Sequence, residues 1–376
     1  MADTIKIGSF EVSSFKVGSS DCKIYLGDTL LYPQTPSVKN YLRFTSKGSG
    51  TFTFYANGAD SSNVLSYSLD SGSTWTQLGN GVATPSVSNG DVIMWKGSSH
   101  TINSNGIGTF SSTTNFDVAG NAMSLYYGDD FEGEVSLSGK DYAFKNLFSG
   151  CTTVIDAENL ELPATTLSNN CYQTMFRYAV NLTKIPKALP ATALTDHCYD
   201  GMYYQCSGVT SIPSHYLSAT TLAPACYWAM FQMCSGITSV DFSIPSTDGG
   251  TPTLAASACT NMFSRCASLT TPPTLPATTL QPQCYYNMFY QNLSLKASPV
   301  LPAPTLVQDC YRQMFYGSTK LNTVTCLATS GINTNGSTTS WLTSASSTGT
   351  FYRASGVSWP TGNSGRKSWT LVNYSG

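Results

Sequence analysis

Apolar and polar residues alternate along the first part of the chain. In residues 1–31 apolar side chains occupy alternate positions in short runs broken by glycine, which predicts a small unit of strands and turns. The stretch "YPQTPSVKN" that follows predicts a linker. From Tyr41 to Tyr127 strand-like runs recur between turns such as "NGAD" and "SNGD", and helical spacing is almost absent. This pattern predicts a β-sandwich of roughly a hundred residues.

A different pattern begins near residue 142, where the chain repeats itself. A Met-Phe pair or a close variant recurs at intervals of 26 to 32 residues. There are seven copies when Leu147-Phe148 is counted as a degenerate first copy. Variants of "LPATTL" separate the copies, and an aliphatic residue follows each aromatic by six positions. Such a unit cannot bury its apolar side alone, so we expect neighbouring copies to stack.

The recurring apolar positions predict one short helix in each copy. In "CYWAMFQMC", residues 226–234, cysteine is at positions 1 and 9, methionine at 5, and aromatics at 2 and 6. Positions 1, 5 and 9 share one face of a helix, and the aromatics lie on its flank. The segments that follow, such as "LTKIP", are short enough to predict strands. We expect the following side chains to form the core of the stack: Phe148, Cys171, Met175, Phe176, Cys198, Met202, Tyr203, Cys226, Met230, Phe231, Met262, Phe263, Cys284, Met288, Phe289, Cys310, Met314 and Phe315.

The repeats resemble BspA-like leucine-rich repeats, through "LPATTLSNNCYQTMFRYAVNLTKIPKALPATAL" and "LPATTLQPQCYYNMF". This resemblance covers about half the chain and implies a solenoid with strands on its concave side and short helices on its convex side. Strands stack about 4.8 Å apart and helices about 8–10 Å apart, so the helical side would fan out and the solenoid would curve.

The whole chain is therefore predicted to be multidomain and mainly β, with an α/β solenoid of about seven rungs. Near the C-terminus, Trp359 and Trp369 lie in a turn-rich segment that would cover the last rung. The predicted parts are an N-terminal β anchor module and linker (1–36), a β-sandwich (37–135), the leucine-rich-repeat solenoid (136–330) and a β C-terminal cap (331–376).

Composition narrows the set of partners. Charged residues make up 11% of the chain, against about 25% in typical domains, and the 19 Lys and Arg balance 21 Asp and Glu without a basic run. We therefore do not expect nucleic acid as a partner. The N-terminal stretch has no apolar run of signal-peptide length, and no later stretch is long enough to cross a bilayer. We expect no membrane insertion and identify no secretion signal.

The 12 cysteines are the most conspicuous chemical feature. Positions 1 and 9 of a helix would lie about 12 Å apart, which is beyond the roughly 7 Å limit between bridged Cα atoms. No CxxC pair suggests zinc, and Ala143, Ala179 and Asn292 occupy cysteine positions in other copies. We predict free thiols packed as small apolar groups, and leave open a few bridges that involve Cys22, Cys151 or Cys326. We expect no metal ion and no cofactor.

Other candidate residues are few. The stretch "SLDSGSTW" matches an Asp-box, but we expect a hairpin turn closed by the Asp70 side chain. The chain has three histidines, His100, His197 and His215, and we expect surface or capping roles for His197 and His215. The acidic stretch "GDDFEGE" could bind calcium or supply a carboxylate pair for glycoside hydrolysis, but we favour a solvated connecting loop. Its carboxylates are Asp129, Asp130, Glu132 and Glu134. We predict no catalytic residue and no enzyme activity.

The first 33 residues, "MADTIKIGSFEVSSFKVGSSDCKIYLGDTLLYP", resemble the start of virion-associated proteins in crAss-like and other phages of gut Bacteroidales. The resemblance implies a phage fibre, appendage or capsid-decorating protein, made in the host cytoplasm and released by lysis. Its N-terminus would dock onto other virion proteins, and its repeats would contact a host-surface protein or glycan. We also expect a homo-oligomer. Two alternatives remain open: a bacterial surface adhesin whose leader was removed, and a polysaccharide depolymerase that uses the acidic stretch.

Overall fold

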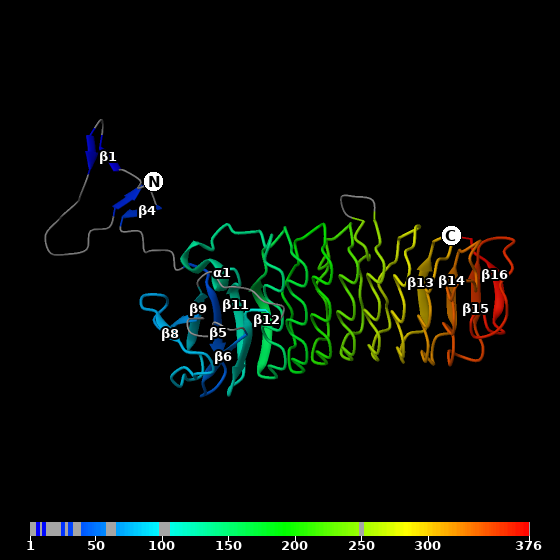
Figure 1. Cartoon of the computed structure of the whole chain (residues 1–376), viewed down its shortest axis with the longest axis horizontal. Coiled ribbons are helices and arrows are strands. Elements are labelled where there is room, and N and C mark those ends of the chain that lie inside the picture. The colour runs from blue at the N-terminus through cyan, green and yellow to red at the C-terminus, as the bar shows by residue number, and fades with distance from the viewer. Residues whose placement is uncertain are drawn as a thin grey trace. The chain divides into compact units, whose positions relative to one another are not determined.

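The computed structural model describes residues 39–57, 65–97, 106–247 and 252–375, together with four strands nearer the N-terminus (Figure 1). The chain divides into two compact units, Met1–Lys39 and Asn40–Gly376. Strands dominate both units. Among the described residues the helical elements are α1 (Ser124–Tyr127) and the 3-10 helix η1 (Gly128–Asp130). The prediction of a mainly β protein is confirmed.

The first unit contains two antiparallel hairpins. Strand β1 (Ile5–Ile7) pairs with β2 (Phe10–Val12), and β3 (Ile24–Leu26) pairs with β4 (Thr29–Tyr32). All four strands begin within residues 1–31, for which the alternation of apolar and polar residues predicted a small unit of strands and turns. The role of this unit as an anchor stays a prediction.

Two sheets open the second unit. The larger has the strand order β12-β11-β5-β9-β7-β8, and the smaller pairs β10 with β6. They meet around aromatic side chains: the ring of Phe44 lies 4.8 Å from that of Phe110 and 5.5 Å from that of Phe52. The sheets therefore pack face to face as in a β-sandwich. The strands are β5 (Leu42–Ser46), β6 (Phe52–Ala56), β7 (Leu65–Ser68), β8 (Thr76–Leu78), β9 (Val92–Gly97), β10 (Gly108–Ser112), β11 (Phe116–Asn121) and β12 (Val154–Glu161).

The sandwich and the repeats share one sheet and one core. Strand β12 follows directly after the first repeat copy, yet it pairs in parallel with β11 of the sandwich. The ring of Phe148, from that first copy, lies 5.7 Å from Phe110 and 5.8 Å from Phe44. The predicted division between residues 135 and 136 therefore lies inside one compact unit.

The described residues of the repeats contain none of the predicted helices, so that part of the fold prediction is wrong. In all seven copies the residues at positions 0, 4 and 8 have positive φ, between 49° and 73°, whereas every residue of an α-helix has negative φ. In the second copy these residues are Asn170, Thr174 and Tyr178. The backbone instead makes consecutive turns with a period of four residues. We call positions 0 to 9 of each copy its turn segment.

Hydrogen bonds within and between copies explain this conformation. At odd positions the N–H donates to the carbonyl three residues earlier, as Met175 N does to Tyr172 O at 3.3 Å. At even positions the N–H donates to the next copy, as Tyr172 N does to Cys198 O at 2.9 Å. Nearly every backbone group is thereby paired without a helix. The turn segments hydrogen-bond directly to one another, so the wide spacing of packed helices that predicted a curved stack does not apply. Figure 1 shows the copies side by side in an almost straight row.

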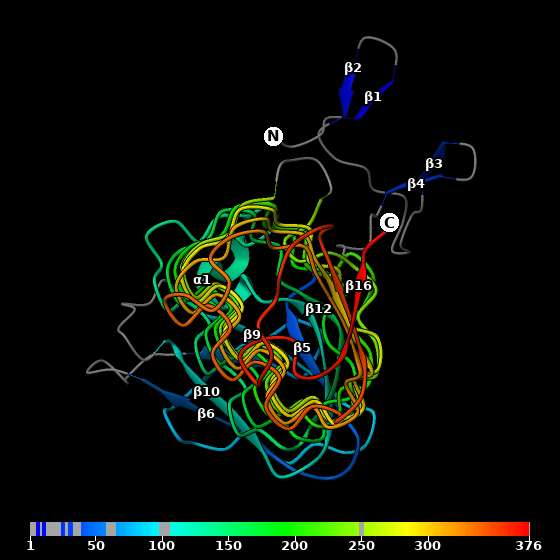
Figure 2. The ribbon, with the colours of Figure 1, turned by 90° about the vertical axis from the view of Figure 1, so that its right-hand side faces the viewer.

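Aromatic rings at equal positions stack between copies. At position 6, centroids of successive rings from Phe148 to Phe315 lie 5.1–6.1 Å apart, with planes within 13° of parallel. A second ladder at position 2 includes Tyr172 and Tyr199, whose centroids are 5.6 Å apart. The view along the stack shows that the ribbons of successive copies superpose (Figure 2). Equal positions then lie above one another, which explains the ladders.

The C-terminal segment extends the stack and covers its end. Strands β13 (Ala297–Leu301), β14 (Thr323–Cys326), β15 (Thr350–Arg353) and β16 (Thr370–Asn373) form one parallel sheet. The Trp341 ring stacks on Tyr311 at 6.1 Å and on Trp359 at 5.6 Å, and Trp369 is buried as well. These indoles shield the last copy from water. No helix within the described ranges is long and apolar enough to span a bilayer.

Candidate binding surface

The residues predicted to form the core of the stack are all interior. Each of the eighteen has 0% exposure, from Phe148 in the first copy to Phe315 in the last. They belong to positions 1, 5 and 6 of the turn segments, where a period of four residues turns the side chains inward. Positions 3, 4, 7 and 8 mostly point outward. Any partner of the repeats therefore meets these outward positions or the extended segments between the turns.

The thiols lie inside the stack, where burial makes them unreactive. Each of the eleven described cysteines is free and buried, and Cys22 lies outside the described residues. Burial raises the pKa of Cys198, Cys234 and Cys326 to about 12. Because the thiolate is the nucleophilic and metal-binding form, these groups are unreactive at neutral pH.

The turn at Asp70 has the predicted structure. The Asp70 carboxylate accepts hydrogen bonds from Thr74 N at 2.8 Å, Thr74 Oγ1 at 2.6 Å and Ser68 Oγ at 2.7 Å. These bonds, those from Thr74 above all, lower the pKa of Asp70 to about 2. The prediction of a turn closed by the aspartate side chain is confirmed.

Asp129, the first carboxylate of the acidic stretch, takes part in a local network of hydrogen bonds. Lys96 Nζ donates to both oxygens of Asp129 at 2.8 Å, and Tyr41 Oη donates to Oδ1 at 2.5 Å. The same lysine lies 4.4 Å from the ring centroid of Trp75. Within the described part of the chain no three His, Cys, Asp or Glu side chains gather as a metal site would require. Through these contacts the Asp129 carboxylate links η1 to the sandwich.

The two described histidines lie at the surface, and His100 is outside the described residues. His197 Nδ1 is 3.0 Å from Asp200 Oδ2, and its ring lies 6.1 Å from that of Trp228. His197 has positive φ at position 0 of its turn segment, next to the predicted helix start, where a turn begins instead. His215 lines a small hollow of about 180 Å³ together with Asp241.

A cluster of aromatic and guanidinium groups lies on the outward side of the turn segments. The guanidinium carbon of Arg177 is 4.5 Å from the ring centroid of Tyr178 and 5.3 Å from that of Tyr204, and Arg177 Nη2 donates to Tyr178 Oη at 2.7 Å. Tyr178 is 37% exposed and Trp228, in the fourth copy, is 39% exposed. Large aromatic surface therefore remains in contact with water here.

The same arrangement recurs toward the C-terminal end of the stack. The rings of Tyr290 and Tyr316 stack at 5.0 Å, and the Arg265 guanidinium lies 5.9 Å from the Tyr290 ring. Arg312 lies 5.9 Å from the ring of Tyr286 in the preceding copy. We call these outward residues the outer face, which comprises Arg177, Tyr178, Tyr204, Trp228, Arg265, Tyr286, Tyr290, Arg312 and Tyr316.

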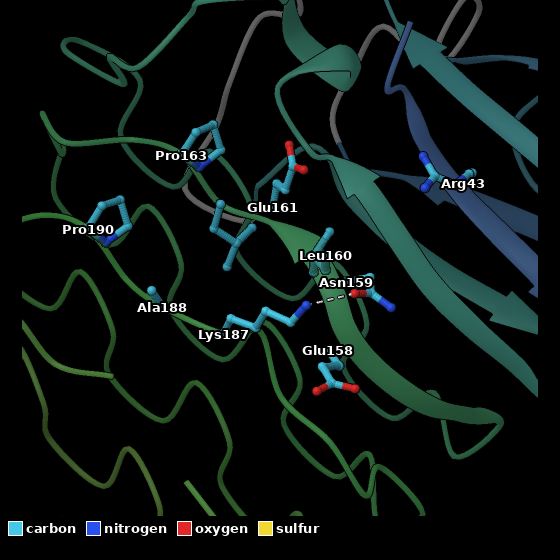
Figure 3. A pocket seen from close by; sticks show the side chains of 10 residues that line it. Arg43, Glu158, Asn159, Leu160, Glu161, Pro163, Lys187, Ala188 and Pro190 are labelled. Atoms are coloured by element: carbon cyan, nitrogen blue, oxygen red, sulfur yellow. Dashed lines mark hydrogen bonds between the residues drawn. The ribbon is translucent and has the colours of Figure 1, made fainter. Parts of the chain in front are cut away.

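A groove of about 460 Å³ opens where the sandwich joins the repeats (Figure 3). Its walls are the end of β12, the segment after the second turn segment, and Arg43 on β5. Lys187 Nζ donates to Asn159 Oδ1 at 3.1 Å across it. The remaining lining side chains are Glu158, Leu160, Glu161, Leu162, Pro163, Ala188 and Pro190.

Neither surface was predicted as a site from the sequence. The outer face could have been found by comparing copies, because positions 3, 7 and 8 vary in residue type and repeatedly hold Tyr, Trp or Arg. The groove left no such signal, since Arg43 and Lys187 are far apart in the chain and line one groove only because β11 pairs with both β5 and β12.

Comparison with known proteins adds no assignment. No protein-family model matches the chain, and no curated protein or solved structure matches it.

Proposed function

We propose that this chain is a non-enzymatic structural protein of a phage virion, a fibre, appendage or capsid decoration that recognises a host-surface component. Its N-terminal module docks on other virion proteins, and its repeats, a solenoid of the BspA-like leucine-rich type with about seven rungs, carry the recognition surface. The active form is a homo-oligomer, which multiplies weak contacts.

The outer face is the observation that carries this proposal. Tyr, Trp and Arg are the residues that dominate binding energy in protein interfaces. Here they recur at fixed positions on a rigid backbone, and contacts such as that of Arg177 with Tyr178 hold them in place before a partner arrives. Ordering in advance lowers the entropy lost on binding.

The division of the chain supports separate anchoring and recognition. Met1–Lys39 is a compact unit of its own, and the sandwich and repeats form the other. A chain divided in this way can carry docking on one unit and recognition on the other.

Incorporation into particles tests the anchoring role. We would express the full chain and a variant lacking residues 1–36 during phage growth, and measure both in purified particles by quantitative mass spectrometry. We expect the full chain in the particles and loss of the truncated chain, which should keep the unfolding transition of the second unit. Incorporation of the truncated chain would contradict the anchor. Absence of the full chain from particles, with binding to Bacteroidales cells retained, would favour the adhesin.

A further inference from the structure

We propose that the groove beside β12 binds an uncharged sugar residue of a surface glycan. This inference rests on the proposed function and names the ligand class and the place where it is held. The groove lies between the sandwich and the second repeat copy, away from the outward positions of the turn segments.

The groove exists because hydrogen bonding between two copies is interrupted. Ala157 N donates to Lys184 O at 2.9 Å, and the next backbone bond between the same copies is from Asn170 N to Asp196 O at 3.0 Å. Between these two bonds only side chains connect the copies, as Lys187 does to Asn159 at 3.1 Å. Between these bonds β12 is held by β11 on its other side. The second copy therefore diverges from β12 and leaves an open space. A similar hollow of about 360 Å³ lies between the fifth and sixth copies, but no charged residue lines it.

Hydrogen-bond donors and acceptors alternate along this space. Glu161 accepts from Asn40 Nδ2 through Oε1 at 2.8 Å, and its second oxygen has no partner among the described residues. Lys187 donates one N–H to Asn159 and retains two others. Arg43 Nη1 donates to Asn40 Oδ1, and the guanidinium takes part in no ion pair within the described ranges. A hydroxyl group both donates and accepts, so it matches such a lining.

The charge balance favours a ligand without net charge. Two cations, Arg43 and Lys187, and two carboxylates, Glu158 and Glu161, line the groove. Glu158 is also bound by Lys184 at 2.8 Å. A phosphate or a polyanion would meet two carboxylates at short range, and a cation would meet the guanidinium and the ammonium. An uncharged polyhydroxylated molecule avoids both repulsions.

The groove floor is apolar. Leu160 and Leu162 line it and are buried, and Pro163 and Pro190 add further apolar lining. A sugar ring presents C–H groups on its faces and hydroxyls around its edge, so it can cover such a floor while its hydroxyls meet the charged walls. A volume of about 460 Å³ is within the usual range for small-ligand sites. The groove is open to solvent, so the ligand can be one residue within a longer glycan.

Ligand-observed NMR on the full chain tests the site. The probes are the methyl glycosides of glucose, galactose and mannose, with glucuronic acid and inorganic phosphate as anionic comparators. The groove variants are Glu161→Gln and Lys187→Met, both at exposed side chains, and the matched control is Lys320→Met on a distant exposed lysine. Thermal unfolding confirms that each variant folds.

We expect at least one neutral glycoside to bind with a millimolar Kd, which rises about tenfold or more in both groove variants and is unchanged in Lys320→Met. The inference is overturned if no neutral glycoside binds, if an anionic probe binds more tightly than all of them, or if the groove variants bind normally. Labelled protein is applied to Bacteroidales cells in parallel. Cell binding without sugar binding removes only the groove assignment, whereas failure of the unchanged chain to bind cells removes the recognition role proposed above.

Discussion

The thiol of Cys234 donates a hydrogen bond to the backbone carbonyl of Tyr203 in the preceding copy, at 2.9 Å. The hydroxyl of Ser318 makes the equivalent bond to the carbonyl of Phe289, also at 2.9 Å. A hydroxyl can therefore replace the thiol as the buried donor at position 9, and sulfur is not required. Two further bonds of this kind join Cys206 to Phe176 and Cys266 to Phe231.

Substitution of the donors at position 9 tests how much they contribute to stability. Cys234→Ser keeps a donor and should change the free energy of unfolding by less than about 1 kcal/mol. Ser318→Ala should cost about 2 kcal/mol, because Ser318 Oγ also accepts from Asn292 N at 3.1 Å and that buried N–H would lose its partner. Denaturant unfolding measures both. A larger loss in Cys234→Ser than in Ser318→Ala would contradict a shared donor role.

Substitution by glycine should stabilise the fold at positions with positive φ and destabilise it at neighbouring positions. Gln283 has φ of 57° and an exposed side chain, and Gln281 is exposed with a φ outside the positive region. We expect Gln283→Gly to stabilise the chain by roughly 0.5–1 kcal/mol and Gln281→Gly to destabilise it by a similar amount. Denaturant unfolding of the pair gives the comparison, and equal effects of the two changes would argue against the turn segments.

Alkaline pH should unfold the stack. Burial raises the pKa of Cys198 and Cys234 from 9.0 to about 12, so the folded state keeps protons that the unfolded state releases above pH 9. Their contribution to stability is complete below pH 9 and is lost as pH rises toward 12, at about 1.4 kcal/mol per pH unit for each group. Urea unfolding from pH 7 to 11 measures the slope. A flat profile above pH 9 would contradict thiol burial.

The Asp70 turn should respond to acid. The pKa of Asp70 is lowered from 3.8 to about 2, so its contribution is present above pH 3.8 and is lost as pH falls through 2. Carbon-13 NMR of the Asp70 carboxyl should show a midpoint near 2. In Thr74→Val, which removes the hydroxyl donor but not the backbone one, the midpoint should rise toward 3.8. No change in that variant would exclude the hydroxyl as a cause of the shift.

The repeat pattern predicted which side chains are buried but not the backbone that buries them. Spacings of four and eight residues suit an α-helix and equally suit turns with a period of four, so Cys171 and Met175 are interior in either case. The distinguishing signal lies at positions 0, 4 and 8, which often hold Asn, Gln, Gly or Ser, as at Asn146, Asn261 and Asn287. Asparagine and glycine tolerate positive φ better than most residues, and that pattern disfavours a helix.

The candidate surfaces were harder to predict because they depend on register between distant segments. The contact of Arg177 with Tyr204 joins two copies, and the groove requires β12 to pair with β11 and not with the next copy. Turn chemistry at Asp70 was predictable because all its partners lie within four residues. Local signals can be read along the chain, whereas surfaces built from several segments need the fold.

Binding to intact cells tests most directly whether the outer face carries recognition. We would label the full chain and the double variant Tyr178→Ala with Trp228→Ala, and measure binding to a panel of Bacteroidales strains by flow cytometry. Tyr374→Ala is the matched control, since Tyr374 is 38% exposed and Tyr178 37%, but Tyr374 lies outside the outer face. We expect the double variant to bind about tenfold more weakly or worse and the control to bind as the unchanged chain does. Undiminished binding by a correctly folded double variant would contradict the account.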